Sequence, residues 1–196
     1  MMLERLNKAI AAFDAANAAD PNIEIWEGQS YPKELLYGQR MSACLKSFAP
    51  DVSEALQLAA RCQHICRWEV PRSSYPMDKA GYHAWRNYLK KYHAEKAGGI
   101  LESVGYEANI IKEVQQLLLK KQLKRNPATQ TLEDVICLVF IEFYLADFVK
   151  KSHYTEEKLI DILQKTWRKM SEKGHQAALQ LKLSTEMTTL IGKALA

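Results

Sequence analysis

Apolar side chains recur every three to four residues along nearly the whole sequence, and no alternation with a period of two persists beyond a few residues. The first spacing places apolar residues on one face of an α-helix, whereas the second is typical of half-buried strands. We therefore expect an all-α protein, a single-domain helical bundle of about eight helices. Residues 135–141 are apolar without interruption, so they should form the central core helix.

Prolines, glycines and capping residues predict where these helices begin and end. Asp51 and Glu54 form a candidate capping box for a third helix that continues to about Trp68. Pro71 and Pro76 predict a loop before the next helix. The predicted helices cover approximately residues 2–18, 32–50, 51–68, 78–105, 107–123, 131–151, 155–174 and 176–194, with a loop at 22–31.

The length of 196 residues suits one well-buried domain over residues 1–196. Hydrophobic residues make up 47% and charged residues 26%, which is ordinary for a globular protein and excludes disordered and collagen-like chains. No run approaches the roughly 20 apolar residues that span a membrane, and no apolar signal core follows the N-terminus. We expect a cytoplasmic protein without membrane contact.

The four cysteines are expected to be reduced thiols, because a chain of this length does not depend on disulfides. Cys62 and Cys66 flank His64, a cluster of residue types that can bind a metal. Structural zinc usually requires CxxC-type pairs, however, and a second pair is missing. No zinc site is therefore predicted here.

Positive charge is concentrated in the middle of the chain. The net charge is +4, but residues 61–96 carry 8 basic and 3 acidic side chains, whereas residues 1–60 carry 5 and 8. A basic segment attracts anions such as a phosphorylated metabolite, a nucleotide or an RNA backbone. A solvated basic face without a ligand is the alternative interpretation. Interleaved aromatic residues are the feature that favours a binding surface.

Two histidines and one aspartate are candidates for a polar site. His64 borders the apolar face of the third predicted helix with Arg67 on its side, while Arg86 and His93, seven residues apart, share a face of the next. Asp134 lies near the start of the core helix, so the three would converge if these helices pack together. We predict His64, His93 and Asp134 as catalytic residues. The alternatives are satisfied core histidines and an Asp134 that only completes a capping box.

The predicted loop and the start of the following helix combine arginines with large aromatic side chains. Arginine binds a phosphate or carboxylate through two parallel hydrogen bonds, and aromatic rings offer a flat face to a base or sugar. Alternatively, the arginines pair with core carboxylates such as Glu142, for which we expect a buried cationic partner. The predicted ligand-binding residues are Arg67, Arg72, Tyr75, Tyr82 and Arg86.

Several short runs resemble one family over about residues 5–180. They include LYGQRM at 36–41, QHICRW at 63–68, QTLEDV at 130–135 and KTW at 165–167. Together they are similar to the family catalogued as domain of unknown function 4202. The name of this family assigns no chemistry.

The order of helices also resembles the HD-domain phosphohydrolases, whose metal site uses an early His, a His-Asp pair and a late Asp. On that pattern His64 corresponds to the His of the pair, His93 to a later histidine and Asp134 to the late Asp. These three residues would hold a metal if one binds. Ile65 replaces the paired Asp, and no early His lies near Tyr37. The resemblance implies an HD-like fold with a depleted metal site.

Three functions follow from these patterns. The first is binding of a phosphorylated small molecule or nucleotide in an Arg/aromatic pocket without a cofactor. The second is a phosphohydrolase with a divalent metal in an altered HD-type site. The third is an RNA-binding or protein-interaction module, although no recognised RNA-binding motif is present. This third function would use Lys120, Lys121, Lys124 and Arg125. For each of the three functions, we expect the protein to be a monomer or weak homodimer.

Overall fold

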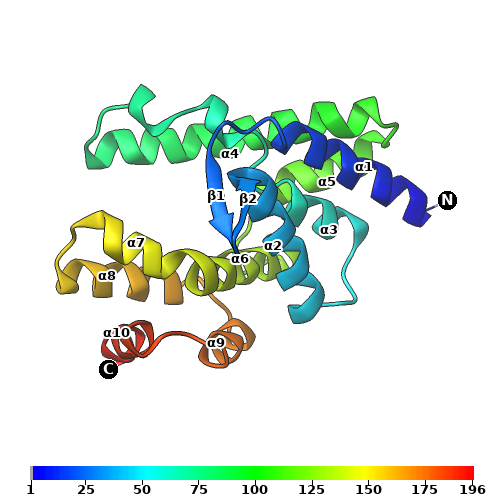
Figure 1. Ribbon diagram of the computed structural model, residues 1–196. Coiled ribbons are helices and arrows are strands. Elements are labelled where there is room, and N and C mark those ends of the chain that lie inside the picture. The colour runs from blue at the N-terminus through cyan, green and yellow to red at the C-terminus, as the bar shows by residue number, and fades with distance from the viewer. Residues whose placement is uncertain (1) are drawn as a thin grey trace. The chain divides into compact units, whose positions relative to one another are not determined.

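The computed structural model describes residues 2–196, and over this range it contains ten α-helices and one small β-hairpin (Figure 1). The all-α prediction is confirmed, with ten helices instead of about eight. The additional helices arise because the predicted segments after residue 131 are divided by turns. The chain divides into two compact units, one ending at Gln122 and the other beginning at Leu123. No helix among the described residues is both long and apolar enough to cross a membrane.

The first unit is built from helices that bury small and aliphatic side chains. α3 packs against both α2 and α5, and α4 packs along α5. Phe13, Met41, Leu58, Ile65 and Leu101 are among its fully buried side chains. Their burial explains the helical spacing of apolar residues in the sequence. The helices are α1 (Met2–Asn17), α2 (Lys33–Phe48), α3 (Glu54–Arg61), α4 (Lys79–Ser103) and α5 (Ala108–Leu118).

The third helix begins later and ends earlier than the sequence predicted. Its N-cap is Ser53, whose hydroxyl oxygen accepts a hydrogen bond from the Leu56 amide at 3.2 Å, so the Asp51–Glu54 capping box was wrong. α3 ends at Arg61 and not near Trp68. Turns follow, in which Cys66 adopts a left-handed backbone with φ of 49°. His64 therefore lies in a turn and Arg67 begins a short 3-10 helix, Arg67–Glu69, so neither side chain follows the face of α3.

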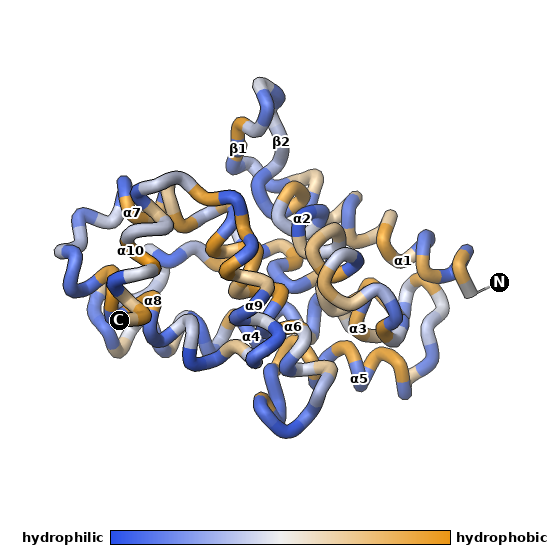
Figure 2. The backbone as a smooth tube through the Cα atoms, turned by 90° about the horizontal axis from the view of Figure 1, so that it is seen from below, coloured by the Kyte–Doolittle hydropathy of each residue, from blue (hydrophilic) through white to orange (hydrophobic). Residues whose placement is uncertain are grey.

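The segment predicted as a loop at 22–31 forms an antiparallel hairpin of β1 (Ile23–Trp26) and β2 (Gln29–Pro32). Glu27 and Gly28 connect the strands. Both have positive φ, as the two central residues of a type I′ turn require. The hairpin projects from the helices of the first unit, and Ile23 and Ile25 on it are exposed (Figure 2).

The second unit starts with a well-capped helix. The side-chain oxygen of Asn126 accepts hydrogen bonds from the amides of Ala128 and Thr129 at 2.9 and 3.1 Å, and Pro127 occupies the first turn. The helix therefore begins before residue 131, and the capping-box interpretation of Asp134 was wrong. The helices of this unit are α6 (Pro127–Val139), α7 (Leu145–Ser152), α8 (Glu156–Trp167), α9 (Glu172–Leu179) and α10 (Thr185–Leu195).

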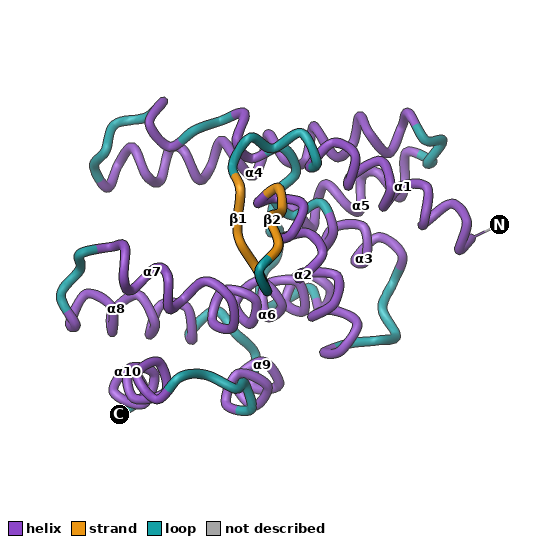
Figure 3. The backbone as a smooth tube through the Cα atoms, in the orientation of Figure 1, coloured by secondary structure: helices purple, strands orange, loops and turns teal. Residues whose placement is uncertain are grey.

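A π-helical turn, Phe140–Tyr144, joins α6 to α7, so the chain stays helical through the junction (Figure 3). Val135, Leu138, Val139 and Ile141 are buried, as expected for a core helix. Glu142 is exposed at the π-helical turn. The expectation of a buried Glu142 was wrong, because the wider turn rotates its side chain out of the apolar stripe.

Candidate functional site

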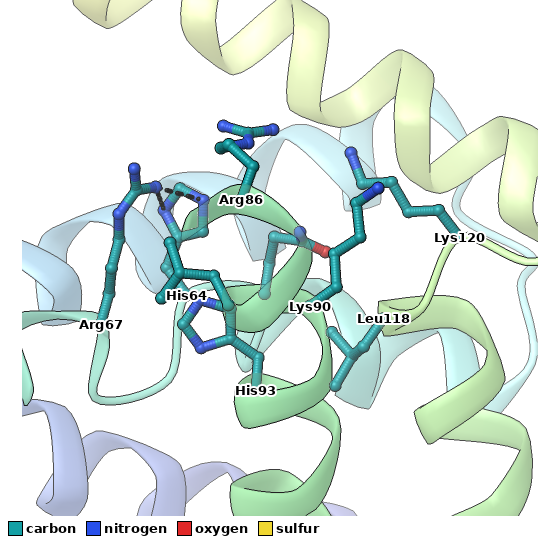
Figure 4. A pocket seen from close by; sticks show the side chains of 9 residues that line it. His64, Arg67, Arg86, Lys90, His93, Leu118 and Lys120 are labelled. Atoms are coloured by element: carbon teal, nitrogen blue, oxygen red, sulfur yellow. Dashed lines mark hydrogen bonds between the residues drawn. The ribbon is translucent and has the colours of Figure 1, made fainter. Parts of the chain in front are cut away.

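A small polar pocket lies within the first unit, where α4 passes the turn that follows α3 and the end of α5 (Figure 4). Its hollow has a volume of about 20 Å³, room for one or two water-sized groups. Leu89 and Leu118 give it an apolar wall. The lining consists of Gln63, His64, Arg67, Arg86, Leu89, Lys90, His93, Leu118 and Lys120.

One face of α4 supplies a row of these side chains. Arg86, Lys90 and His93 are spaced by four and three residues, which returns nearly to the same angle on a helix. The α4 N-terminus is fixed by Asp78, whose carboxylate accepts a hydrogen bond from the Gly81 amide at 2.7 Å. The sequence prediction that Arg86 and His93 face the same way fits this lining.

His64 is held by three neighbours. Its ring stacks on Tyr37 with centroids 4.1 Å apart, and Arg67 Nη1 lies 2.9 Å from its Nε2. A guanidinium can only donate, and Nη1 lies nearer to Nε2 than to Nδ1, which is 3.3 Å away, so Nε2 is the better-placed acceptor. Nδ1 also lies 3.3 Å from Glu34 Oε2. Burial, followed by the nearby Arg67 and Arg86, lowers the pKa of His64 well below 6.5. The ring is therefore neutral at pH 7.

His93 is also neutral, and one of its nitrogens is unsatisfied. Nδ1 lies 2.9 Å from the carbonyl oxygen of Ile65, so this nitrogen carries the proton and donates. Burial, with His64 as the second cause, lowers the pKa of His93 to about 3. Its Nε2 is buried without a hydrogen-bond partner among residues 2–196, and the same holds for Oε1 of Gln63.

Positive charge dominates the lining, which has four cationic side chains and no carboxylate. Arg67 stacks over the Trp85 ring at 4.9 Å, and burial lowers its pKa while Glu34 opposes that shift. The Glu34 carboxyl is itself buried, and burial raises its pKa. Arg86 and Lys90 form no ion pair within the described part of the chain. The pocket thus carries positive charge that one buried carboxylate balances only in part.

These residues do not fit a divalent metal. Over residues 2–196 the structure forms no group of three His, Cys, Asp or Glu side chains that could hold an ion. Arg67, Arg86, Lys90 and Lys120 share the pocket lining with the two histidines, and their positive charge repels a cation. A metal held by His64, His93 and Asp134 finds no support in this lining.

Asp134 lies in the second unit and fixes the start of α9. Its carboxylate accepts hydrogen bonds from the Ser171 amide at 2.7 Å, the Ser171 hydroxyl at 2.6 Å and the Gln130 side chain at 3.1 Å. Ser171 in turn caps α9 by accepting from the Gly174 amide. The structure brings His64 and His93 together, with ring centroids 5.8 Å apart, and gives Asp134 contacts of its own.

Three of the predicted ligand-binding residues do not line the pocket. The Arg72 guanidinium donates to the carbonyl oxygens of Tyr75, Pro76 and Asp78 at 3.0, 2.6 and 3.2 Å, and so fixes the loop. Tyr75 packs near Tyr88, and Tyr82 is exposed one turn before the pocket face of α4. Arg67 and Arg86 do line it.

Sequence reasoning missed the part played by Glu34, Tyr37, Gln63 and Lys90. Lys90 was detectable, because it lies four residues after Arg86 and three before His93 on the same helical face. Glu34 was not, because an acidic residue in a first helical turn is an ordinary stabilising feature. Only the fold places its carboxylate beside His64.

Comparison with known proteins identifies one family. A family model described as "Domain of unknown function (DUF4202)" matches residues 7–191, which is nearly the whole chain. No curated protein and no solved structure matches this sequence.

Proposed function

The chain belongs to the DUF4202 family, whose description names no activity, so from the pocket itself we propose that the protein binds a phosphorylated small molecule or nucleotide. One observation carries the proposal. Arg67, Arg86, Lys90 and Lys120 line a single small hollow that has no carboxylate in its lining. An anion is the ligand class that such a lining attracts.

The electrostatics of the free pocket favour an anion. Arg86 lies close enough to Arg67 to lower the pKa of that guanidinium, so the two like charges oppose each other without a ligand. A phosphoryl group relieves this repulsion and accepts charge-assisted hydrogen bonds from several of the four cations at once. Figure 4 draws Arg86, Lys90 and Lys120 with their charged ends toward the same space.

The size of the hollow bears on where the anion binds. About 20 Å³ is too small for a phosphoryl group, so the phosphoryl oxygens would lie at the mouth among the arginine and lysine ends. Tyr82 is exposed one helical turn before Arg86 and offers a face on which a nucleotide base can stack. An HD-type phosphohydrolase with an altered metal site stays the alternative, and it requires ligands that this lining lacks.

Isothermal titration calorimetry with inorganic phosphate and adenosine monophosphate tests the proposal. Lys90 lines the pocket, whereas its neighbour Lys91 is exposed on another face of α4. We expect Lys90→Met to weaken binding about tenfold, the value of one charge-assisted contact. Lys91→Met is the matched control, with the same loss of charge and an unchanged expected affinity.

The outcomes separate the functions. No heat and no rise in melting temperature with either anion would exclude the proposed pocket. Equal losses in Lys90→Met and Lys91→Met would show binding by overall charge alone. Stabilisation by RNA but by neither small anion would favour the RNA-binding interpretation.

A further inference from the structure

Two acceptor atoms at the pocket have no donor. His93 is 4% exposed and Gln63 is 6% exposed, yet Nε2 of the first and Oε1 of the second lack a partner among residues 2–196. A buried polar atom that stays unpaired destabilises the state in which it lacks a partner. A ligand hydroxyl that donates to either atom supplies a partner that residues 2–196 do not.

The protonation of His93 follows from its geometry. Nδ1 faces the Ile65 carbonyl oxygen at 2.9 Å, and that oxygen can only accept, so the proton is on Nδ1. Nε2 of the neutral ring is then a bare acceptor. His64, Arg67 and Glu34 are the titratable groups that act on this ring, and Arg86 and Lys90 line the same pocket from α4. A deprotonated phosphoryl oxygen cannot satisfy the bare nitrogen, because it can only accept.

The hollow selects the size of the donor. A volume of about 20 Å³ has room for a hydroxyl group. The cations meanwhile attract an anion to the same place. A single ligand meets both demands if it carries a phosphoryl group and, a few bonds away, a free hydroxyl.

We propose that the pocket binds a phosphate monoester of a polyol or sugar, whose free hydroxyl enters the hollow and donates to His93 Nε2 or Gln63 Oε1 while its phosphoryl group pairs with Arg86 and Lys90. This inference rests on the proposed function, because it names the ligand class of that same pocket. A site built to accept from a hydroxyl discriminates strongly against an analogue that lacks it.

The test compares two probes of equal charge and chain length, glycerol 3-phosphate and propyl phosphate, by calorimetry on the full-length protein. We expect glycerol 3-phosphate to bind at least about tenfold more tightly, because propyl phosphate leaves both acceptors unpaired. In Gln63→Leu, in His93→Leu or in both, according to which atom accepts the hydroxyl proton, this preference should shrink while the affinity for propyl phosphate is kept. Gln116→Leu is the control, since Gln116 is exposed on α5 and does not line the pocket.

Each result has one meaning. Equal affinity for the two probes in the wild-type protein overturns the hydroxyl inference and leaves the anion pocket standing. Absence of binding by both probes and by inorganic phosphate overturns the proposed function instead. If His93→Leu does not fold by circular dichroism, the comparison of the two probes in the wild-type protein still decides, and a preference for glycerol 3-phosphate that is unchanged in both folded variants contradicts the proposal.

Discussion

Neutral histidines beside arginines are the most informative feature at the scale of single residues. His93 is buried and His64 is half-buried in a positive environment, and each has a nitrogen beside a partner, Arg67 for His64 and the Ile65 carbonyl for His93. Burial and like charge both oppose protonation. These rings are therefore suited to accept hydrogen bonds at pH 7, and they do not act as cations.

This arrangement predicts how stability depends on pH. The pKa of each histidine is lowered in the folded state, so below pH 6.5 the unfolded chain binds more protons than the folded one, and stability falls as the pH falls toward about 3 for His93. Denaturant unfolding between pH 6.5 and 5 should show a slope of up to about 1.4 kcal/mol per pH unit from each histidine.

His64→Gln should reduce that slope, and His83→Gln, on an exposed part of α4, is the control. Glu34 has a raised pKa and contributes in the opposite sense, with stability lost as the pH rises above 4.5, so the comparison with the variant isolates the histidine effect. A slope that is the same in wild type and His64→Gln would contradict the neutral, buried state of this ring.

Asp134 is expected to act on stability. Its carboxylate accepts three hydrogen bonds that fix Ser171, the cap of α9. Asp134→Ala should lower the free energy of unfolding by about 1 to 3 kcal/mol, measured by urea titration. The affinity of the folded variant for inorganic phosphate should be unchanged. A variant with native stability and no phosphate binding would restore Asp134 as a site residue.

At the scale of secondary structure, the close approach of α2 to α3 positions His64. A Cβ on Gly38 would lie 2.7 Å from the carbonyl oxygen of Arg61, the last residue of α3. That contact is with backbone, so it cannot be relieved by a rotamer change. The turn that carries His64 begins directly after it, and only a glycine on α2 lets the two helices approach this far.

Gly38→Ala should therefore destabilise the protein by about 1 to 3 kcal/mol, the usual cost of overpacking. Gly99→Ala is the matched control, because nothing lies within 4 Å of a Cβ there and the residue is inside α4. That variant should be more stable by about 0.5 to 1 kcal/mol, since alanine favours helix. Thermal or urea unfolding measures both, and similar effects of the two substitutions would contradict the close α2–α3 contact.

At the scale of the whole molecule, the chain forms two compact units, and every pocket residue belongs to the first. A fragment of residues 1–122 is therefore expected to fold and to keep its affinity for inorganic phosphate, since it retains its own buried core. Circular dichroism and calorimetry on this fragment check the prediction. A helical fragment without phosphate binding would show that the second unit is needed for the pocket.

The sequence by itself determined the helical class, the family and one face of α4. Apolar spacing along a helix depends on neighbours three and four residues away, so the long α4, with Arg86 and His93 on one side, was predictable. The capping residues were harder to predict, because several polar residues near a helix start compete for the same amides. Ser53 and Asn126 are the caps, whereas the sequence favours Asp51 and, in the capping-box interpretation of Asp134, Thr131.

Only the tertiary structure decided what surrounds the histidines. Glu34 and Tyr37 on α2 meet His64 on the turn after α3, and Lys120 after α5 lines the same pocket as Lys90 on α4. Contacts between residues so far apart in sequence depend on how whole helices pack, which local periodicity does not specify. The bare nitrogen of His93 is likewise a tertiary property, because it is defined by a partner that the surrounding fold does not supply.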